Sequence, residues 1–274
     1  MFIKNNELYE MKCLWSLPYS RGYEINPGSI AKVFINLSPY HLLMKKRKIE
    51  LATYYRDIPE LAIPLEPLET EDSIGYIQDK KEGVPFSDYL KNARETVTLQ
   101  EIIHYICTLE RVVKICHHHC PSMVFPDIAS HGNVLYNPKT KTVGIVDYDG
   151  NQISTIADTN ISDYIYEPFY SLVTQSKYLK NNRFTSNIDI LSLITLFLHY
   201  TTNSNLGTIY KENNNIDQFI HQLGLTGTQF ADCIKLVLDP NGKNRYISES
   251  LEELDKQYIL ISNTSCGGRT FMKK

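Results

Sequence analysis

The chain has 274 residues, with 28 Lys and Arg against 31 Asp and Glu, for a net charge of −3 at pH 7. This balance offers no basic surface for nucleic acid, so we expect no nucleic-acid partner. The length exceeds the size at which one hydrophobic core stops growing, which predicts two lobes. Six cysteines in a chain this long are no disulfide scaffold, which favours a reduced, cytoplasmic protein. The polar N-terminus is unlike a signal peptide. Delivery into another cell by a route without such a peptide stays open.

The first predicted strand carries a lysine. Residues 29–37 alternate and are rich in β-branched side chains, which predicts a strand with Lys32 inside it. Ser38-Pro39 then resembles an N-cap followed by proline at the first helical position, so a helix is predicted through about Tyr55. That helix contains Glu50. Taken singly, Lys32 and Glu50 are better explained as solvated side chains of a strand and a helix; their order with the downstream Asp, Asn and Asp favours the functional interpretation.

The segment after this helix predicts a strand, a connector and two helices. Residues 73–81 are typical of a strand that runs into a charged connector, and a short helix begins after Gly83. Thr98-Leu-Gln-Glu101 is a capping box that opens a longer helix. Apolar side chains at positions 102, 103, 106, 109, 113 and 116 form the stripe of a core-facing helix.

The most informative stretch places an Asp, an Asn and a second Asp on closely spaced turns. Asp127 and Asn133 precede the apolar residues 134–136, and Asp147 follows the apolar residues 143–146. The turn-like residues 137–140 between these runs predict a hairpin with Asn133 and Asp147 at the same end. A carboxylate near an amide and a second carboxylate is the layout of phosphoryl transfer on a metal-bound nucleotide. The alternative is a surface hairpin with ordinary loop residues.

A later helix is predicted to lie in the core. Residues 187–200 are apolar almost all round, which predicts a buried helix. This run is too short and too interrupted to cross a bilayer, so no membrane span is expected. The C-terminal half as a whole is mostly helical by its periodicity.

A cluster of cysteine and histidine lies at the end of the long helix, at Cys116-His117-His118-His119-Cys120. Zinc could use such ligands. The alternative is that the cysteines are small buried side chains and that the histidines favour the helix C-terminus electrostatically. Because the sequence contains no second ligand cluster, the alternative is the stronger interpretation.

The stretch from Asp127 to Gly150 resembles the catalytic and metal-binding loops of the protein kinase-like phosphotransferase superfamily, which reads H-R-D-x-x-x-x-N and then D-F-G. The closing pattern around Asp239-Pro240 and Arg245 is similar to that of protein kinases. The resemblance covers about residues 20–260. It implies an α+β class with a two-lobed kinase-like fold: a β-rich N-lobe with one main helix over 1–82, and a larger helical C-lobe over 83–274.

The resemblance also implies roles for individual residues. Asp127 would orient the acceptor hydroxyl, while Asn133 and Asp147 would bind Mg²⁺. Lys32 would contact the nucleotide phosphates and pair with Glu50. The turn between Gly22 and Gly28 would cradle the phosphates, and the connector from Gln78 to Lys80 would hold adenine through its backbone. Asp189 is similar to the carboxylate with which the central helix of kinases holds the catalytic loop.

The chain departs from the family pattern at three places. The interval from Asp127 to Asn133 is one residue longer than in the family pattern. Pro126 replaces the arginine that precedes the catalytic aspartate. Asp149 occupies the position of the glycine in D-F-G, and Gly150 follows one place later. The last feature is reminiscent of some bacterial kinase-like phosphotransferases. No A-P-E motif closes residues 151–186, where Glu167-Pro168 is the nearest candidate.

The resemblance implies an ATP-dependent kinase that uses Mg²⁺ and transfers the γ-phosphoryl group to a hydroxyl, with a protein Ser or Thr as the first expectation. A small-molecule phosphotransferase and a pseudokinase that serves as a binding module remain alternatives. The absence of a G-x-G-x-x-G sequence and the longer loop favour the pseudokinase. The presence of the full Lys, Glu, Asp, Asn and Asp set favours the enzyme.

Overall fold

The computed structural model describes residues 5–52, 55, 57–70, 73–93, 97–119, 123–125, 128, 132–146, 152–153, 187–202, 206, 209, 215–239, 246–262 and 269–274. The chain divides into two compact units. The N-terminal unit contains residues 1–83 together with 144–149, and the C-terminal unit contains residues 84–143 and 150–274. Residues 144–149 thus belong to the first unit, although the sequence interpretation assigned them to the C-lobe.

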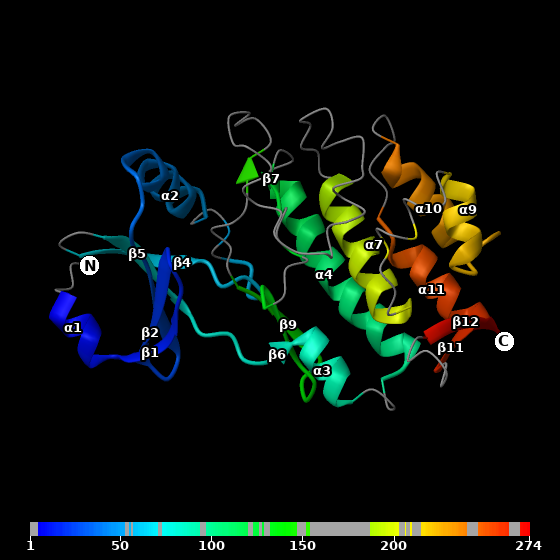
Figure 1. Cartoon of the computed structure of the whole chain (residues 1–274), viewed down its shortest axis with the longest axis horizontal. Coiled ribbons are helices and arrows are strands. Elements are labelled where there is room, and N and C mark those ends of the chain that lie inside the picture. Colours follow the sequence, from blue (N-terminus) through cyan, green and yellow to red (C-terminus); the bar gives the residue numbers. More distant parts are fainter. Residues whose placement is uncertain are drawn as a thin grey trace. The chain divides into compact units, whose positions relative to one another are not determined.

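The N-terminal unit is a five-stranded antiparallel sheet with two helices (Figure 1). The strands lie in the order β1-β2-β3-β5-β4. The lysine-bearing strand, the helix that begins at Pro39 and the strand before the connector are all confirmed. In chain order the elements are α1 (Asn5–Glu10), β1 (Lys12–Ser16), β2 (Ser20–Asn26), β3 (Ser29–Phe34), α2 (Pro39–Ala52), β4 (Pro64–Glu69) and β5 (Ile74–Asp79).

The two faces of this sheet bury different side chains. Because successive side chains of a strand point to opposite faces, Ala31 and Val33 lie on one face and Lys32 on the other. Ala31 and Val33 belong to a buried cluster, which also contains Leu8, Tyr23 and Leu68. Phe34 shares the face of Lys32 and belongs to a second cluster, which also contains Ile49 of α2, Ile74 and Tyr76. Helix α2 therefore packs on the sheet face that carries Lys32.

The C-terminal unit is mainly helical. Strands β6, β8 and β9 form a three-stranded sheet in the order β6-β8-β9, while β7 pairs with β10 and β11 with β12. The last residues of β9 belong to the N-terminal unit. The elements are β6 (Val84–Pro85), α3 (Phe86–Asn92), α4 (Leu99–His119), β7 (Met123–Val124), β8 (Val134–Asn137), β9 (Thr142–Ile145), β10 (Gln152–Ile153), α7 (Asn187–Thr202), α9 (Ile216–Gln222), α10 (Gln229–Leu238), α11 (Ser248–Gln257), β11 (Tyr258–Ser262) and β12 (Arg269–Lys273).

Helices α4 and α7 form the centre of this unit and lie side by side (Figure 1). The predicted stripe on α4 is confirmed, since all six of its side chains are buried. The predicted burial of α7 is also confirmed, because almost every one of its residues is buried. The capping box is confirmed in its first half: the side-chain oxygen of Thr98 accepts a hydrogen bond from the backbone N–H of Glu101 at 3.2 Å.

The carboxylate of Glu101 serves the aromatic core instead of the helix cap. It accepts hydrogen bonds from the hydroxyl groups of Tyr89 (2.8 Å) and Tyr136 (3.2 Å). Both tyrosines pack around Phe86, which stacks on Tyr105 with a centroid distance of 3.9 Å. Stacked and edge-to-face rings add specific geometry to the burial of apolar area. This cluster joins α3, α4 and β8.

Candidate functional site

Lys32 is a buried cation on the face of the N-terminal sheet against which α2 packs. Its residue is only 6% exposed, although lysine is almost never fully buried unless it is paired. The ammonium lies 5.4 Å from the centre of the Phe34 ring. Glu50, its expected partner, lies on α2 and is exposed. The ion pair between the two stays a prediction.

The same face carries a cluster of three more charges. Glu24 is paired in register with Ile30, two positions before Lys32, so it points to the face of Lys32. Its carboxylate lies 2.5 Å from Nζ of Lys80 and 3.4 Å from Nζ of Lys12. The hydrogen bonds from Lys80 and Lys12 lower the pKa of Glu24. With Lys32, these residues supply three cations and one anion, and Glu69, which pairs with Ile74, adds a second carboxylate to the same face.

The two glycines expected to cradle phosphates lie at different places. Gly22 lies within β2, where it pairs with Lys32 of β3, so it is no part of a loop. Gly28 lies in the turn between β2 and β3, and its carbonyl accepts the backbone N–H of Lys80 at 2.9 Å. The turn between β1 and β2 covers residues 17–19 and contains no glycine.

The connector after β5 begins at groups that are already bonded within the unit. Gln78 pairs with Ile30 and is buried, with its side chain on the face of Lys32. Both the backbone N–H and the ammonium of Lys80 have partners in the sheet. Contact of this connector with adenine stays a prediction.

The backbone that leads to Asp147 is bonded to the N-terminal unit. The N–H of Ile145 donates to the carbonyl of Glu60 at 2.7 Å, and the N–H of Ala62 donates to the carbonyl of Ile145 at 2.8 Å. These bonds form a parallel bridge between Leu61 and Ile145. Asp147 itself lies outside the described residues. Ile145, two residues before Asp147, nevertheless belongs to the same unit as Lys32.

The backbone that leads to Asp127 is bonded to the central helix. Asp189 is fully buried at the start of α7, and its carboxylate accepts the backbone N–H of Phe125 at 2.7 Å. Burial raises the pKa of Asp189, while the bonds from His117 and Phe125 oppose the increase. Asp127 lies outside the described residues. The bond to Phe125 is the contact expected from the resemblance for Asp189.

His117 is a site residue that the sequence interpretation missed. Its Nε2 donates to the carboxylate of Asp189 at 2.7 Å, and the side chain is 6% exposed. Among the described residues, no partner bonds to its Nδ1. Its position two residues before the end of α4, next to the buried Cys116, was the only available signal, because the partner lies far away in the sequence.

The cysteine and histidine cluster at residues 116–120 is only partly within the described residues. His117 is bonded to Asp189, Cys116 is buried, and His118 and His119 are exposed. In the part of the chain that the structure describes, no group of three or more His, Cys, Asp or Glu side chains is placed to hold a metal ion. Cys120 lies outside that part. The burial of Cys116 is what the alternative to zinc expects of this cysteine.

Asn133 lies directly before β8, in a turn that requires glycine. Gly132 has a φ of +88°, a conformation that glycine adopts without strain and other residues rarely do. Asn133 is partly exposed. Amide and carboxylate oxygens are the hard donors that Mg²⁺ prefers, so Asn133 and Asp147 fit this ion chemically.

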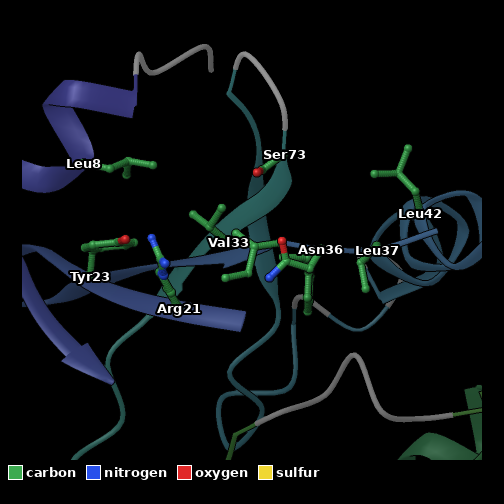
Figure 2. Close-up of a pocket in the computed structure, with 10 residues that line it drawn as sticks. Leu8, Arg21, Tyr23, Val33, Asn36, Leu37, Leu42 and Ser73 are labelled. Atoms are coloured by element: carbon green, nitrogen blue, oxygen red, sulfur yellow. The ribbon is translucent and has the colours of Figure 1, made fainter. Parts of the chain in front are cut away.

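A separate pocket of about 380 Å³ lies in the N-terminal unit (Figure 2). Figure 2 shows Leu8 of α1 and Leu42 of α2 at its two sides, with Arg21 and Val33 of the sheet between them. Lys32 is absent from its lining. Arg21, Tyr23 and Val33 of the lining lie on the opposite face of the sheet from Lys32, whereas Phe34 of the lining lies on the same face.

No helix among the described residues is long and apolar enough to cross a membrane.

No protein-family model and no curated protein matches the sequence. The solved structure of the autoinhibited serine kinase domain of the giant muscle protein titin is similar, with a TM-score of 0.63 over 90% of this chain and 80% of that chain, at 14% sequence identity. At this identity, the similarity shows the fold alone. The chain thus has a mixed α and β, protein kinase-like fold, with a five-stranded N-terminal sheet and a helical C-terminal unit.

Proposed function

We propose that the protein is an ATP-dependent kinase that transfers the γ-phosphoryl group to a hydroxyl, with a protein Ser or Thr as acceptor. The observation that carries the proposal is the placement of Lys32. It is a buried cation on the sheet face that α2 covers, in the unit to which the backbone before Asp147 is bonded. A buried cation in the unit from which the chain continues to the predicted metal-binding carboxylate suits a metal-bound triphosphate.

The residues divide the work as follows. Lys32 holds the phosphates, and Asn133 and Asp147 hold Mg²⁺, which neutralises the charge that develops on the transferred group. Asp127 orients the acceptor hydroxyl and accepts its proton. The bond from Phe125 to Asp189 fixes the backbone two residues before Asp127. Catalysis of this type depends on positioning and electrostatics.

A pseudokinase is the second candidate. The observation that favours it is the turn over residues 17–19, which has no glycine between β1 and β2. A phosphate-binding loop uses consecutive backbone N–H groups, and glycine permits their close approach. An assay that reports binding and transfer separately distinguishes the two candidates.

The test uses the full chain with labelled ATP, Mg²⁺, and generic protein and small-molecule hydroxyl acceptors. Asp127→Ala should abolish transfer but keep the rise in melting temperature that Mg·ATP causes, because only the hydroxyl loses its partner. Asp147→Asn should lose most of that rise. Lys32→Met should lower turnover strongly. Asp57→Asn, at an exposed carboxylate in the same unit, is the control and should match the original protein.

Each result bears on the proposal. Binding without transfer to any acceptor supports the pseudokinase. Transfer that persists in Asp127→Ala removes that residue from its role, and an equal thermal shift in Asp147→Asn removes the metal assignment.

A further inference from the structure

The indole of Trp15 covers the sheet beside Lys32. Trp15 lies on β1 and is paired in register with Gly22 of β2, which in turn is paired with Lys32 of β3. Side chains of directly paired residues point to the same face. The indole, the α-carbon of Gly22 and the lysine side chain therefore form one row across three strands.

The ring lies directly on Gly22. A β-carbon added to Gly22 would overlap the atoms Cη2, Cζ3 and Cε3 of the Trp15 ring. These atoms belong to the six-membered part of the indole, so the ring extends away from β1 and across β2. Glycine is required here because any other residue would displace the ring.

An irregularity of β1 determines which face the indole occupies. Lys12 pairs with Glu24 and Cys13 with Tyr23, but Trp15 then pairs with Gly22, so one extra residue enters β1 at this point. Such a bulge redirects the following side chains. Without it, Leu14 would pair with Gly22, and Trp15 would lie one position further along the strand, on the opposite face. The bulge thus brings Trp15 to the face of Lys32.

We propose that Trp15 is a gate on the nucleotide site: its indole covers the sheet beside Lys32 and must move before Mg·ATP can be held there. The inference rests on the proposed function, since it concerns the same site. A phosphate chain bound to Lys32 approaches the row in which the ring lies. An apolar ring offers phosphate oxygens little of the hydrogen bonding that they lose from water. The closed position therefore competes with the nucleotide.

The gate makes a quantitative prediction. If nucleotide binds only when the indole has moved, the apparent dissociation constant equals the intrinsic one divided by the fraction of open molecules. A closed state in about nine of ten molecules thus weakens binding about tenfold. Removing the ring should therefore strengthen Mg·ATP binding by the same factor.

The test measures Mg·ATP affinity by calorimetry in the original protein and two variants. Trp15→Ala removes the gate, and Gly22→Ala displaces it without removing it, because the new methyl group occupies the place of the ring. Both variants should bind Mg·ATP severalfold more tightly. Leu43→Ala, which removes an exposed apolar side chain in the same unit (65% exposed), is the control and should leave the affinity unchanged.

The chain contains one tryptophan, so its fluorescence reports the gate directly. Nucleotide added to the original protein should shift the emission to longer wavelength as the ring leaves Gly22. Gly22→Ala should show the shifted emission before any nucleotide is added. Circular dichroism verifies that both variants are folded.

The outcomes separate the two proposals. Weaker Mg·ATP binding by Trp15→Ala would show that the indole contacts the nucleotide. Unchanged affinity in both variants would show that the indole has no role in binding. Each of these two results overturns the gate and leaves the kinase proposal standing. An absence of Mg·ATP binding in all the proteins, both gate variants included, overturns the kinase proposal and the gate with it.

Discussion

The carboxylate of Asp189 lies 2.7 Å from the backbone nitrogen of Phe125 and, with its other oxygen, 2.7 Å from Nε2 of His117. One buried side chain at the start of α7 thus joins the end of α4 to the backbone that leads to Asp127. All three groups are in the core of the C-terminal unit.

Removing this carboxylate should destabilise the fold. Asp189→Ala leaves a buried N–H and a buried imidazole without their acceptor, and we expect the free energy of unfolding to fall by about 3 kcal/mol. Asp189→Asn keeps a carbonyl oxygen for the N–H of Phe125 and should lose less. Urea denaturation measures both. Equal losses in the two variants would show that the bond to Phe125 contributes nothing.

A second buried carboxylate holds the start of α11. Glu110 accepts the backbone N–H groups of Ile247 and Ser248, the latter at 3.1 Å, and pairs with Lys114 at 3.3 Å. Glu110→Ala leaves these donors without an acceptor inside the protein, so it should lower the free energy of unfolding by about 2–3 kcal/mol.

The comparison with Lys114 separates capping from charge pairing. The side chain of Lys114 is 37% exposed, and Lys114→Met should cost under about 1 kcal/mol, as is usual for pairs near solvent. Glu110→Gln keeps an acceptor and should fall between the two. Urea titrations measure the free energy of unfolding of each variant. If Lys114→Met lowers it as much as Glu110→Ala does, the result contradicts the capping role of Glu110.

Stability should fall at alkaline pH. Burial, followed by the bond to Glu101, raises the pKa of Tyr89 to about 12, and burial also raises the pKa of Tyr105, Tyr136 and Tyr200. The unfolded phenols lose their protons near pH ~10, whereas the folded ones retain them. The stability that the protonated phenols contribute is complete below pH ~10, the pKa of the unfolded tyrosines, and is lost as the pH rises towards their pKa values in the folded protein.

Urea midpoints measured from pH ~8 to ~11 test this slope. Tyr89→Phe should fall less steeply than the original protein, because one phenol of raised pKa is gone. Tyr19→Phe, at a tyrosine that is 65% exposed, should follow the original curve. A Tyr89→Phe curve with an unchanged slope would remove Tyr89 from the explanation.

Alkylation should distinguish the cysteines. Cys13 is exposed, whereas burial raises the pKa of Cys107 to about 12. The thiolate is the reactive form, so iodoacetamide at neutral pH should modify Cys13 long before Cys107. Peptide mass spectrometry over time measures both rates. Cys13→Ser identifies the fast peptide, and modification of Cys107 at the rate of Cys13 would contradict the raised pKa of Cys107.

Much of the fold could be predicted from the sequence because its signals are local. The burial of α7 followed from an apolar run, and the buried face of α4 from a helical repeat. The start of α2 followed from Ser38-Pro39, and the side-chain oxygen of Ser38 indeed accepts the backbone N–H of His41. Each of these signals lies within a few residues of the feature that it predicts.

Long-range contacts could not be predicted in this way. His117 appeared to be part of a cysteine and histidine cluster, yet its partner is Asp189 on another helix. The sequence analysis did not single out Glu110, which caps α11. No periodicity in the sequence encodes which buried acceptor meets which donor, because that depends on how the helices pack.

The N-terminal sheet shows the same division most clearly. The sequence by itself determined the strand with Lys32 and the helix that follows, since alternation and capping are local properties. Only the tertiary structure decided that Gly22 lies inside a strand under the indole of Trp15, and that the backbone before Asp147 is bonded to the segment after α2. Strand register and bulges set these neighbours, and a shift of one residue would have moved every side chain to the opposite face.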